Sequence, residues 1–368
     1  MIYYLPLEQY PERYTQLMSC PNGWAESKFK ECGMDFVRVD GTQISTTIKN
    51  GCVLDAKGRS VYALTQMSNF MTNYFDDLQD EDIVYTEDFW HPGIEALFYT
   101  RQLTNKHFKI GCFCHAQSVD DTDFTWAMRD WMRPIEQGYG KQYDFIFTCS
   151  HILRKLLIDA GVGNENNVFT VGLPFNAQRL HEQMIDMGVE FGHKEDYVLF
   201  SSRFDDEKDP MFFLDLVERC PDIQFKLVSP YESRPPSRNP EVMKRLNGII
   251  ENNGNLELVK TYNKRDYYQT LANAKVQFNC AHQDWVSWTL VEASMLGCSP
   301  LYPIWKDFGY ELEKHPECLY EKRNLDDAEA KLRKLMSMDC VDTSDVYTKH
   351  DKSWNNYLKI MRTNKCTM

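Results

Sequence analysis

The stretch DWVSWTLVEASMLG, residues 284–297, joins a loop to the start of a helical pattern. It follows KVQFNCA (275–281), a short apolar run typical of a buried strand. The helix is expected to begin near Trp288 or Thr289, with Ser287 as its N-cap, and to stop at the final glycine of the stretch. The first N–H groups of a helix lack partners within it, and its dipole is positive at that end. This strand–loop–helix junction therefore favours an anion.

Two acids of this stretch, Asp284 and Glu292, are separated by seven residues. Asp284 is expected in the loop before the helix, and Glu292 one turn into it on the same side. A carboxylate can accept hydrogen bonds from two vicinal hydroxyl groups, so this pair suits the recognition of a sugar or a ribose. Alternatively, Asp284 is an ordinary loop acid and Glu292 an exposed first-turn acid that favours the helix dipole. The spacing alone leaves both interpretations open.

A second loop of this kind follows YVLFSS (197–202), where the sequence continues as RFDDEKDP. Arg203 and Lys208 lie just past the carboxyl end of that predicted strand, with four residues between them. Two cations in a turn before a helix are well placed to bind a diphosphate. The alternative is a solvated charged loop, in which the cations are balanced by the three intervening acids.

Short apolar runs alternate with helical patterns along the whole chain. This alternation predicts an α/β fold with two Rossmann-like, doubly wound domains facing a cleft. The polar segment 176–196 interrupts the alternation, so the domains are expected at 1–185, with a returning C-terminal helix at 345–368, and at 190–344. Ligands of such folds bind at the carboxyl ends of the strands, which makes the cleft the expected site.

His115 follows KIGCFC (109–114), a predicted strand of the first domain, and would lie at that strand's carboxyl end. It is either a cleft residue or a core histidine with its hydrogen bonds satisfied. The loop beyond it carries three acids, including Asp121, in the pattern DDTD. A short DxD match can indicate a metal site, but matches of three residues are common by chance, and a solvated loop is the expected interpretation.

Composition limits the class of protein. The chain has 368 residues, 43% of them apolar, and a net charge of −13 from 54 acids and 41 bases. A surplus of acids disfavours broad, non-specific binding to nucleic acid, although it permits a local basic groove. The twelve cysteines form no CxxC pair, which favours free thiols in a reducing compartment. No apolar run approaches the roughly 20 residues of a membrane span, and the N-terminus lacks the pattern of a signal peptide.

Taken in order, these motifs resemble those of the retaining GT-B glycosyltransferases over residues 82–305. SRFDDEKD resembles the family's arginine–lysine loop, and DWVSWTLVE resembles its E-x7-E motif. LELVKTY, DFIFTCSHILRKLLIDAGV and VFTVGLPFN match three further segments. The chain departs from the family where Asp284 replaces the first glutamate and WVSW replaces Gly-Phe-Gly, which suggests a changed sugar pocket.

The resemblance implies roles for individual residues in a reaction that uses a UDP-sugar as co-substrate and needs no bound metal. Arg203 and Lys208 would hold the donor diphosphate and stabilise its growing charge. Glu292 would bind the donor ribose and Asp284 a hydroxyl of the transferred sugar. His115 would lie near the anomeric centre, and Asp121 would assist at the acceptor. The remaining donor-binding candidates are Tyr262, Ser287, Trp288 and Thr289.

Within this family, the sequence is most similar to phage enzymes that glycosylate modified cytosine in DNA. The similarity includes SWTLVEASMLGCSPLYPIWKD, FCHAQSV and the opening YYLPLEQYPERYT. It implies double-stranded DNA bearing 5-hydroxymethylcytosine as acceptor, no membrane partner and a cytoplasmic location in the host cell. Arabinose is preferred over glucose because bulky residues replace the glycines. An enzyme acting on a polysaccharide or lipid-linked acceptor, and an inactive nucleotide- or DNA-binding module, remain alternatives.

DNA binding would require basic side chains that converge on the acceptor domain. The candidates are KFK (28–30), RQLTNKHFK (101–109), RDWMR (129–133) and Lys141.

Overall fold

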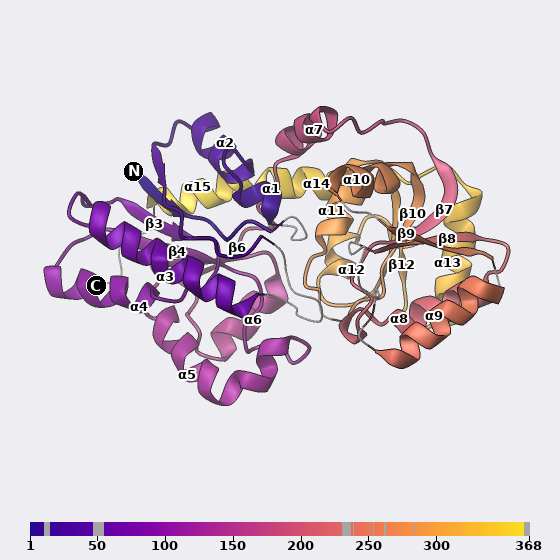
Figure 1. Ribbon diagram of the computed structural model, residues 1–368, viewed down its shortest axis with the longest axis horizontal. Coiled ribbons are helices and arrows are strands. Elements are labelled where there is room, and N and C mark those ends of the chain that lie inside the picture. The colour runs from indigo at the N-terminus through magenta and orange to yellow at the C-terminus, as the bar shows by residue number, and fades with distance from the viewer. Residues whose placement is uncertain are drawn as a thin grey trace. The chain divides into compact units, whose positions relative to one another are not determined.

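The computed structural model describes residues 1–10, 15–46, 55–229, 237, 239–252, 254–260, 263–282 and 284–363. The chain divides into two compact units (Figure 1). The first comprises Met1–Arg179 together with His350–Met368, and the second comprises Leu180–Lys349. Tyr262, a predicted donor-binding residue, lies outside the described residues.

The first unit is built on a six-stranded sheet in the order β2-β1-β3-β4-β5-β6, and every strand pairs in parallel with its neighbours. Its strands are β1 (Ile2–Leu5), β2 (Phe36–Arg38), β3 (Ile83–Thr86), β4 (Lys109–Cys114), β5 (Phe145–Thr148) and β6 (Val168–Thr170). Its helices are α1 (Gln16–Ser19), α2 (Trp24–Glu31), α3 (Ala56–Asn73), α4 (Ile94–Thr104), α5 (Arg129–Gly140), α6 (His151–Asp159) and α15 (Ser353–Thr363), with a 3-10 turn, η1 (Phe124–Met128). Helix α7 (Ala177–Asp186) follows at the junction with the second unit.

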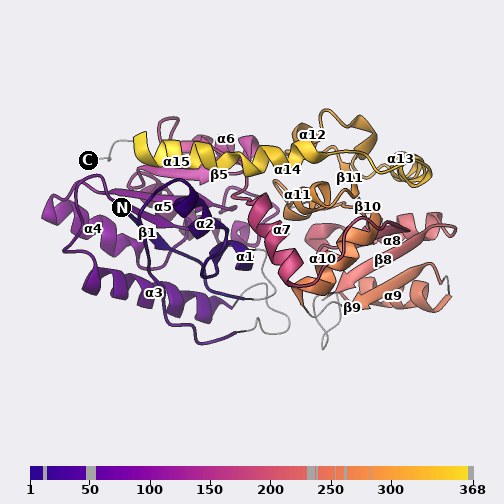
Figure 2. The ribbon, with the colours of Figure 1, turned by 90° about the horizontal axis from the view of Figure 1, so that it is seen from above.

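Helices cover both faces of the first sheet because its strands carry large apolar side chains on both sides. On β1, Tyr3 meets Phe70 of α3, with ring centroids 5.5 Å apart, while Tyr4 meets Phe29 of α2 at 5.6 Å. Figure 2 shows α3 on one side of this sheet and α6 and α15 on the other. Tyr357 attaches α15 to the first unit, since its hydroxyl donates to the carbonyl of Gly172 at 2.9 Å.

Residues 344–363 form two helices rather than the single returning helix predicted over 345–368, of which 364–368 lie outside the described residues. Helix α14 (Ser344–Asp351) ends just before α15 begins. The junction is anchored by buried His350, whose Nδ1 accepts a hydrogen bond from the backbone N–H of Leu173 at 3.0 Å.

The second unit contains a second parallel sheet, in the order β12-β11-β10-β7-β8-β9. Its strands are β7 (Glu195–Phe200), β8 (Gln224–Ser229), β9 (Leu256–Lys260), β10 (Ala274–Phe278), β11 (Ser299–Pro303) and β12 (Leu319–Tyr320). Its helices are α8 (Pro210–Arg219), α9 (Pro240–Asn252), α10 (Lys264–Asn273), α11 (Trp288–Met295), α12 (Phe308–Glu311) and α13 (Leu325–Ser337), with two 3-10 turns, η2 (Asp206–Lys208) and η3 (Pro316–Cys318).

Alternate residues of β7 build the two cores of this unit. Val198 and Phe200 pack in a cluster with residues of α8, α9 and α13, whereas Tyr197 and Leu199 pack with residues of α10 and α11. In Figure 1, α10 and α11 accordingly lie on the other side of the sheet from α8, α9 and α13. The period of two along a strand thus produces a helix layer on each face. The prediction of two doubly wound α/β domains is confirmed.

Candidate functional site

The strand order of the second sheet reverses between β7 and β10. These neighbouring strands pair as far as Phe200 and Phe278, and their chains then leave the sheet in two loops, one at 201–209 and one that includes 279–282 and 284–287. In doubly wound folds, ligands bind outside the carboxyl ends of the strands at such a reversal. Both motifs singled out in the sequence lie in these two loops or in the helix that follows the second one.

Backbone contacts hold the two loops together. The N–H of His282 donates to the carbonyl of Glu207 at 3.0 Å, and the thiol of Cys280 lies 3.3 Å from the carbonyl of Lys208. The Lys208 ammonium forms an ion pair with the carboxylate of Asp284, and their side chains are 8% and 23% exposed. Two residues that the sequence separates by 76 positions therefore meet at the reversal.

Neighbouring charges fix the remaining ionic groups of the first loop. The Arg203 guanidinium, which is 36% exposed, lies 2.8 Å from a carboxylate oxygen of Glu207. Asp209 is held by Arg323 at 3.0 Å and by His282 at 2.9 Å. Burial would raise the pKa of the Asp209 carboxyl, but the hydrogen bonds from His282 and Arg323 outweigh it and hold that pKa below its usual range. Asp209 therefore acts as a charged anchor between loops.

Helix α11 begins at Trp288, as predicted, and Ser287 occupies the N-cap position. The Ser287 side chain makes no capping hydrogen bond, however, because its hydroxyl accepts from the hydroxyl of Tyr302 at 3.3 Å. The first turn also lacks acidic residues. Because Ser287 makes no capping hydrogen bond and the first turn holds no acid, this helix end is suitable for an anionic ligand. Thr289 and Trp288 are both half-buried in the first turn.

Glu292 lies inside the second unit rather than on its surface. It is 6% exposed, and its two carboxylate oxygens accept hydrogen bonds from Tyr267 at 2.6 Å and Tyr268 at 2.8 Å. Burial raises the pKa of Glu292, against the opposing effects of Lys264 and the two tyrosines. The alternative of an exposed first-turn acid is therefore wrong. The sequence patterns did not identify either tyrosine, although the two stand as a pair in α10.

Trp285 is also buried in the second unit. It is 6% exposed, and the ammonium of Lys306 lies 3.9 Å from its ring centroid. The indole N–H of Trp305 donates to the carbonyl of His282 at 2.8 Å, which joins the loop after β11 to the loop after β10. Three strand-end loops thus meet around the Asp284 segment.

His115 and Asp121 belong to the first unit. His115 lies directly after β4, with a ring nitrogen 3.0 Å from the carbonyl oxygen of Glu87, and Asp121 is exposed. The acids on either side of Asp121 have local structural roles: Asp120 accepts from the backbone N–H of Thr122 at 3.0 Å, and Asp123 caps the turn η1. Within the described ranges, no group of three or more His, Cys, Asp or Glu residues could hold a metal ion.

Several basic residues considered for DNA binding are unavailable to a phosphate. Arg101 is buried and lies 2.6 Å from Asp144, while the buried ammonium of Lys109 lies 2.9 Å from Glu81.

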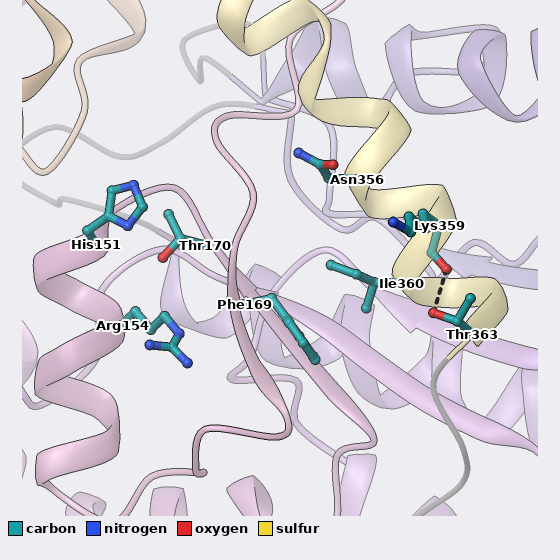
Figure 3. A pocket seen from close by; sticks show the side chains of 8 residues that line it. All are labelled: His151, Arg154, Phe169, Thr170, Asn356, Lys359, Ile360 and Thr363. Atoms are coloured by element: carbon teal, nitrogen blue, oxygen red, sulfur yellow. Dashed lines mark hydrogen bonds between the residues drawn. The ribbon is translucent and has the colours of Figure 1, made fainter.

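A hollow of the first unit, about 470 Å³ in volume, opens between α6, β6 and α15 (Figure 3). None of the predicted site residues lines it; the lining residues are His151, Arg154, Phe169, Thr170, Asn356, Lys359, Ile360 and Thr363.

Among solved structures, similarity extends over nearly the whole chain. A sucrose-phosphate synthase from Thermosynechococcus elongatus has a TM-score of 0.63 at 11% identity, over 98% of this chain and 96% of that chain. A trehalose-6-phosphate synthase has a TM-score of 0.64 at 11% identity, over 98% and 99%. A glycosyltransferase from Rickettsia africae has a TM-score of 0.58 at 12% identity, over 98% and 95%.

These likenesses show the fold, which is the GT-B arrangement of two Rossmann-like domains, as the sequence predicted. No family model matches the chain, and no curated protein matches it. In the part of the chain that the structure describes, none of the helices combines the length and the apolar character that a membrane span requires.

Proposed function

We propose that this protein is a retaining glycosyltransferase that takes its sugar from a UDP-sugar. The observation that carries the proposal is the group of side chains at the β7–β10 reversal. Arg203, Lys208 and the start of α11 lie there with the buried carboxylate of Glu292, which matches the needs of a diphosphate and a ribose. Solved structures with this fold include enzymes described as UDP-forming trehalose-phosphate synthases.

The donor-binding roles follow from this chemistry. Arg203 and Lys208 bind the diphosphate, together with the N–H groups at Trp288 and Thr289 beyond the N-cap residue Ser287. Glu292 accepts hydrogen bonds from the ribose hydroxyls. Asp284 binds a hydroxyl of the transferred sugar, and Tyr262, outside the described residues, stays a donor-binding candidate from the sequence.

In the reaction, the bond between the anomeric carbon and the leaving diphosphate breaks, and a bond to the acceptor oxygen forms on the same face of the sugar. The acceptor proton passes to the departing phosphate. Arg203 and Lys208 stabilise the negative charge that develops on the leaving group. We assign His115 to the surroundings of the anomeric carbon and Asp121 to the acceptor. The proposal includes no metal ion and no covalent intermediate.

For the acceptor, we propose the hydroxymethyl group of 5-hydroxymethylcytosine in double-stranded DNA, with arabinose preferred over glucose. The sequence resemblance supports the acceptor, and buried Trp285, in place of a glycine, supports a small sugar. The burial of Arg101 and Lys109 means that DNA contacts depend on other cations. The competing acceptor is a polysaccharide or a lipid-linked sugar, and the competing non-enzymatic function is nucleotide or DNA binding by an inactive chain.

Mass spectrometry of duplex DNA tests the acceptor and the sugar together. A duplex with 5-hydroxymethylcytosine is incubated with the protein and, in separate reactions, UDP-arabinose, UDP-glucose, UDP-galactose and UDP-N-acetylglucosamine. We expect a mass increase of one pentosyl residue with UDP-arabinose, and none on a matched duplex with unmodified cytosine. A gain only with UDP-glucose would overturn the choice of sugar. If no donor increases the mass of the duplex while a UDP-sugar is measurably hydrolysed, DNA is overturned as the acceptor, but the assignment as a glycosyltransferase stands.

A further inference from the structure

Each cation assigned to the diphosphate already contacts a carboxylate of the protein. Lys208 is paired with Asp284, and Arg203 with Glu207. The formal charges of these four groups cancel, and the loop 201–209 as a whole carries two bases and four acids. A diphosphate entering this site meets carboxylates that compete with it for the same cations.

The carboxylates of Asp209 and Asp284 differ in how firmly the protein holds them. Asp209 is held by two side chains, Arg323 at 3.0 Å and His282 at 2.9 Å. For Asp284, the structure shows one ion pair, to Lys208, and its side chain is the more exposed member of that pair. The backbone bond from His282 to Glu207 keeps the two loops together independently of these side chains. Asp284 can therefore leave Lys208 without separating the loops.

We propose that Asp284 and the donor diphosphate exchange places on Lys208, so that nucleotide binding releases Asp284 to accept a hydrogen bond from the transferred sugar. This inference rests on the proposed donor site. Two anions near one ammonium repel each other, so the carboxylate moves when the diphosphate arrives. A displaced carboxylate is costly unless it regains a hydrogen-bond donor, and the sugar hydroxyls are the donors that the substrate supplies. Asp284 thereby makes binding of the complete UDP-sugar more favourable than binding of UDP alone.

Calorimetry with UDP and UDP-arabinose on the full chain tests the exchange. In Asp284→Asn, the competing carboxylate is lost, so we expect UDP to bind about tenfold more tightly, as for the loss of one partly buried competing charge. The ratio of UDP-arabinose affinity to UDP affinity should fall, because a neutral amide accepts a weaker hydrogen bond from the sugar than a carboxylate does. If the pair only positions Lys208, the same variant binds UDP more weakly or unchanged, and that result overturns the exchange.

A matched control and a second variant make the result decisive. Asp196→Asn removes a carboxylate paired with Lys275 at 2.9 Å, outside the two loops, and should leave both affinities unchanged. Glu207→Gln removes the carboxylate that competes with the diphosphate for Arg203. It should also tighten UDP binding, by a smaller factor because Arg203 is more exposed. Should Asp284→Asn fail to fold, unchanged or weaker UDP binding by Glu207→Gln overturns the proposal. Wild-type protein that binds no UDP would overturn the donor site itself, whereas wild-type binding without a gain in either variant overturns the exchange alone.

Discussion

Replacement of Glu292 by glutamine is the sharpest test of the donor site, because the structure limits what this side chain can still bind. A carboxylate offers about four acceptor positions. Tyr267 and Tyr268 each occupy one, on different oxygens, at 2.6 and 2.8 Å. About two positions remain, which is the number that the vicinal hydroxyls of a ribose require.

Glutamine keeps the shape of the side chain but has one acceptor oxygen and no charge. The variant should therefore lose at least one hydrogen bond to a charged group, worth about 1.5–3 kcal/mol. Each 1.4 kcal/mol corresponds to a tenfold change in affinity, so the loss of one such bond should weaken UDP binding roughly 10- to 100-fold.

The assay is a thermodynamic cycle, measured by calorimetry with UDP and 2′,3′-dideoxy-UDP on both proteins. We expect Glu292→Gln to weaken the binding of UDP and to leave the binding of the dideoxy compound unchanged, because that compound lacks the two ribose hydroxyls. Tyr268→Phe, which removes one fixed donor, serves as a matched control with a smaller effect. An equal loss for both ligands would refute the ribose assignment and give Glu292 a purely structural role.

Thermal melting over a range of pH separates binding from stability. Because burial raises the pKa of Glu292 in the folded protein, the favourable contribution of its protonated form is complete below its unfolded pKa. That contribution is lost as the pH rises through the folded value. Glu292→Gln should consequently gain stability relative to wild type as the pH is raised, and its melting curve at neutral pH shows whether it is folded where UDP binding is measured.

Further predictions concern the diphosphate and the first unit. Arg203→Ala with Lys208→Ala should abolish sugar transfer in a radiolabel assay without unfolding the protein; activity near wild type would contradict the diphosphate role. Asp144→Ala leaves the buried Arg101 without its partner at 2.6 Å, and should cost about 3–5 kcal/mol in urea denaturation. Burial lowers the pKa of His91 to about 3. The free energy of unfolding should thus fall by up to about 1.4 kcal/mol per pH unit below pH 6.5, and His91→Gln should flatten that slope.

The sequence predicts the fold because the signals that define it are local. Strand periodicity, the start of α11 at Trp288 and the placement of loops after strands all depend on residues close together in the chain. Ser287 shows the limit of what such a local signal can predict. Its position as N-cap residue is correct, yet its hydroxyl bonds to Tyr302, 15 residues away, rather than to the helix. A pattern identifies the residue type that can cap but not the competing donor that the fold brings to it.

Charged residues were the least predictable part of the molecule, since their environment is set by distant neighbours. Arg101 and Lys109 lie in a stretch that reads as a basic surface, but both are buried beside acids. Lys208 and Glu292 were assigned to ligands from their spacing. In the structure, however, Lys208 is paired with Asp284, and Glu292 accepts hydrogen bonds from two tyrosines. The spacing of charges along a chain cannot show which of them the folded protein has already neutralised.

The net charge of −13 therefore says little about whether this protein can bind a phosphorylated donor. Charges separated by more than about 8 Å are largely screened at physiological ionic strength, so the field at the donor depends on groups that almost touch it. There the decisive features are the helix end at Trp288, where the N-cap residue Ser287 makes no capping hydrogen bond, and the cations Arg203 and Lys208, each countered by an acid. Affinity for an anion is thus controlled by how readily Asp284 and Glu207 give up their partners. Two conservative substitutions at these acids should alter donor binding more than any change in the overall charge.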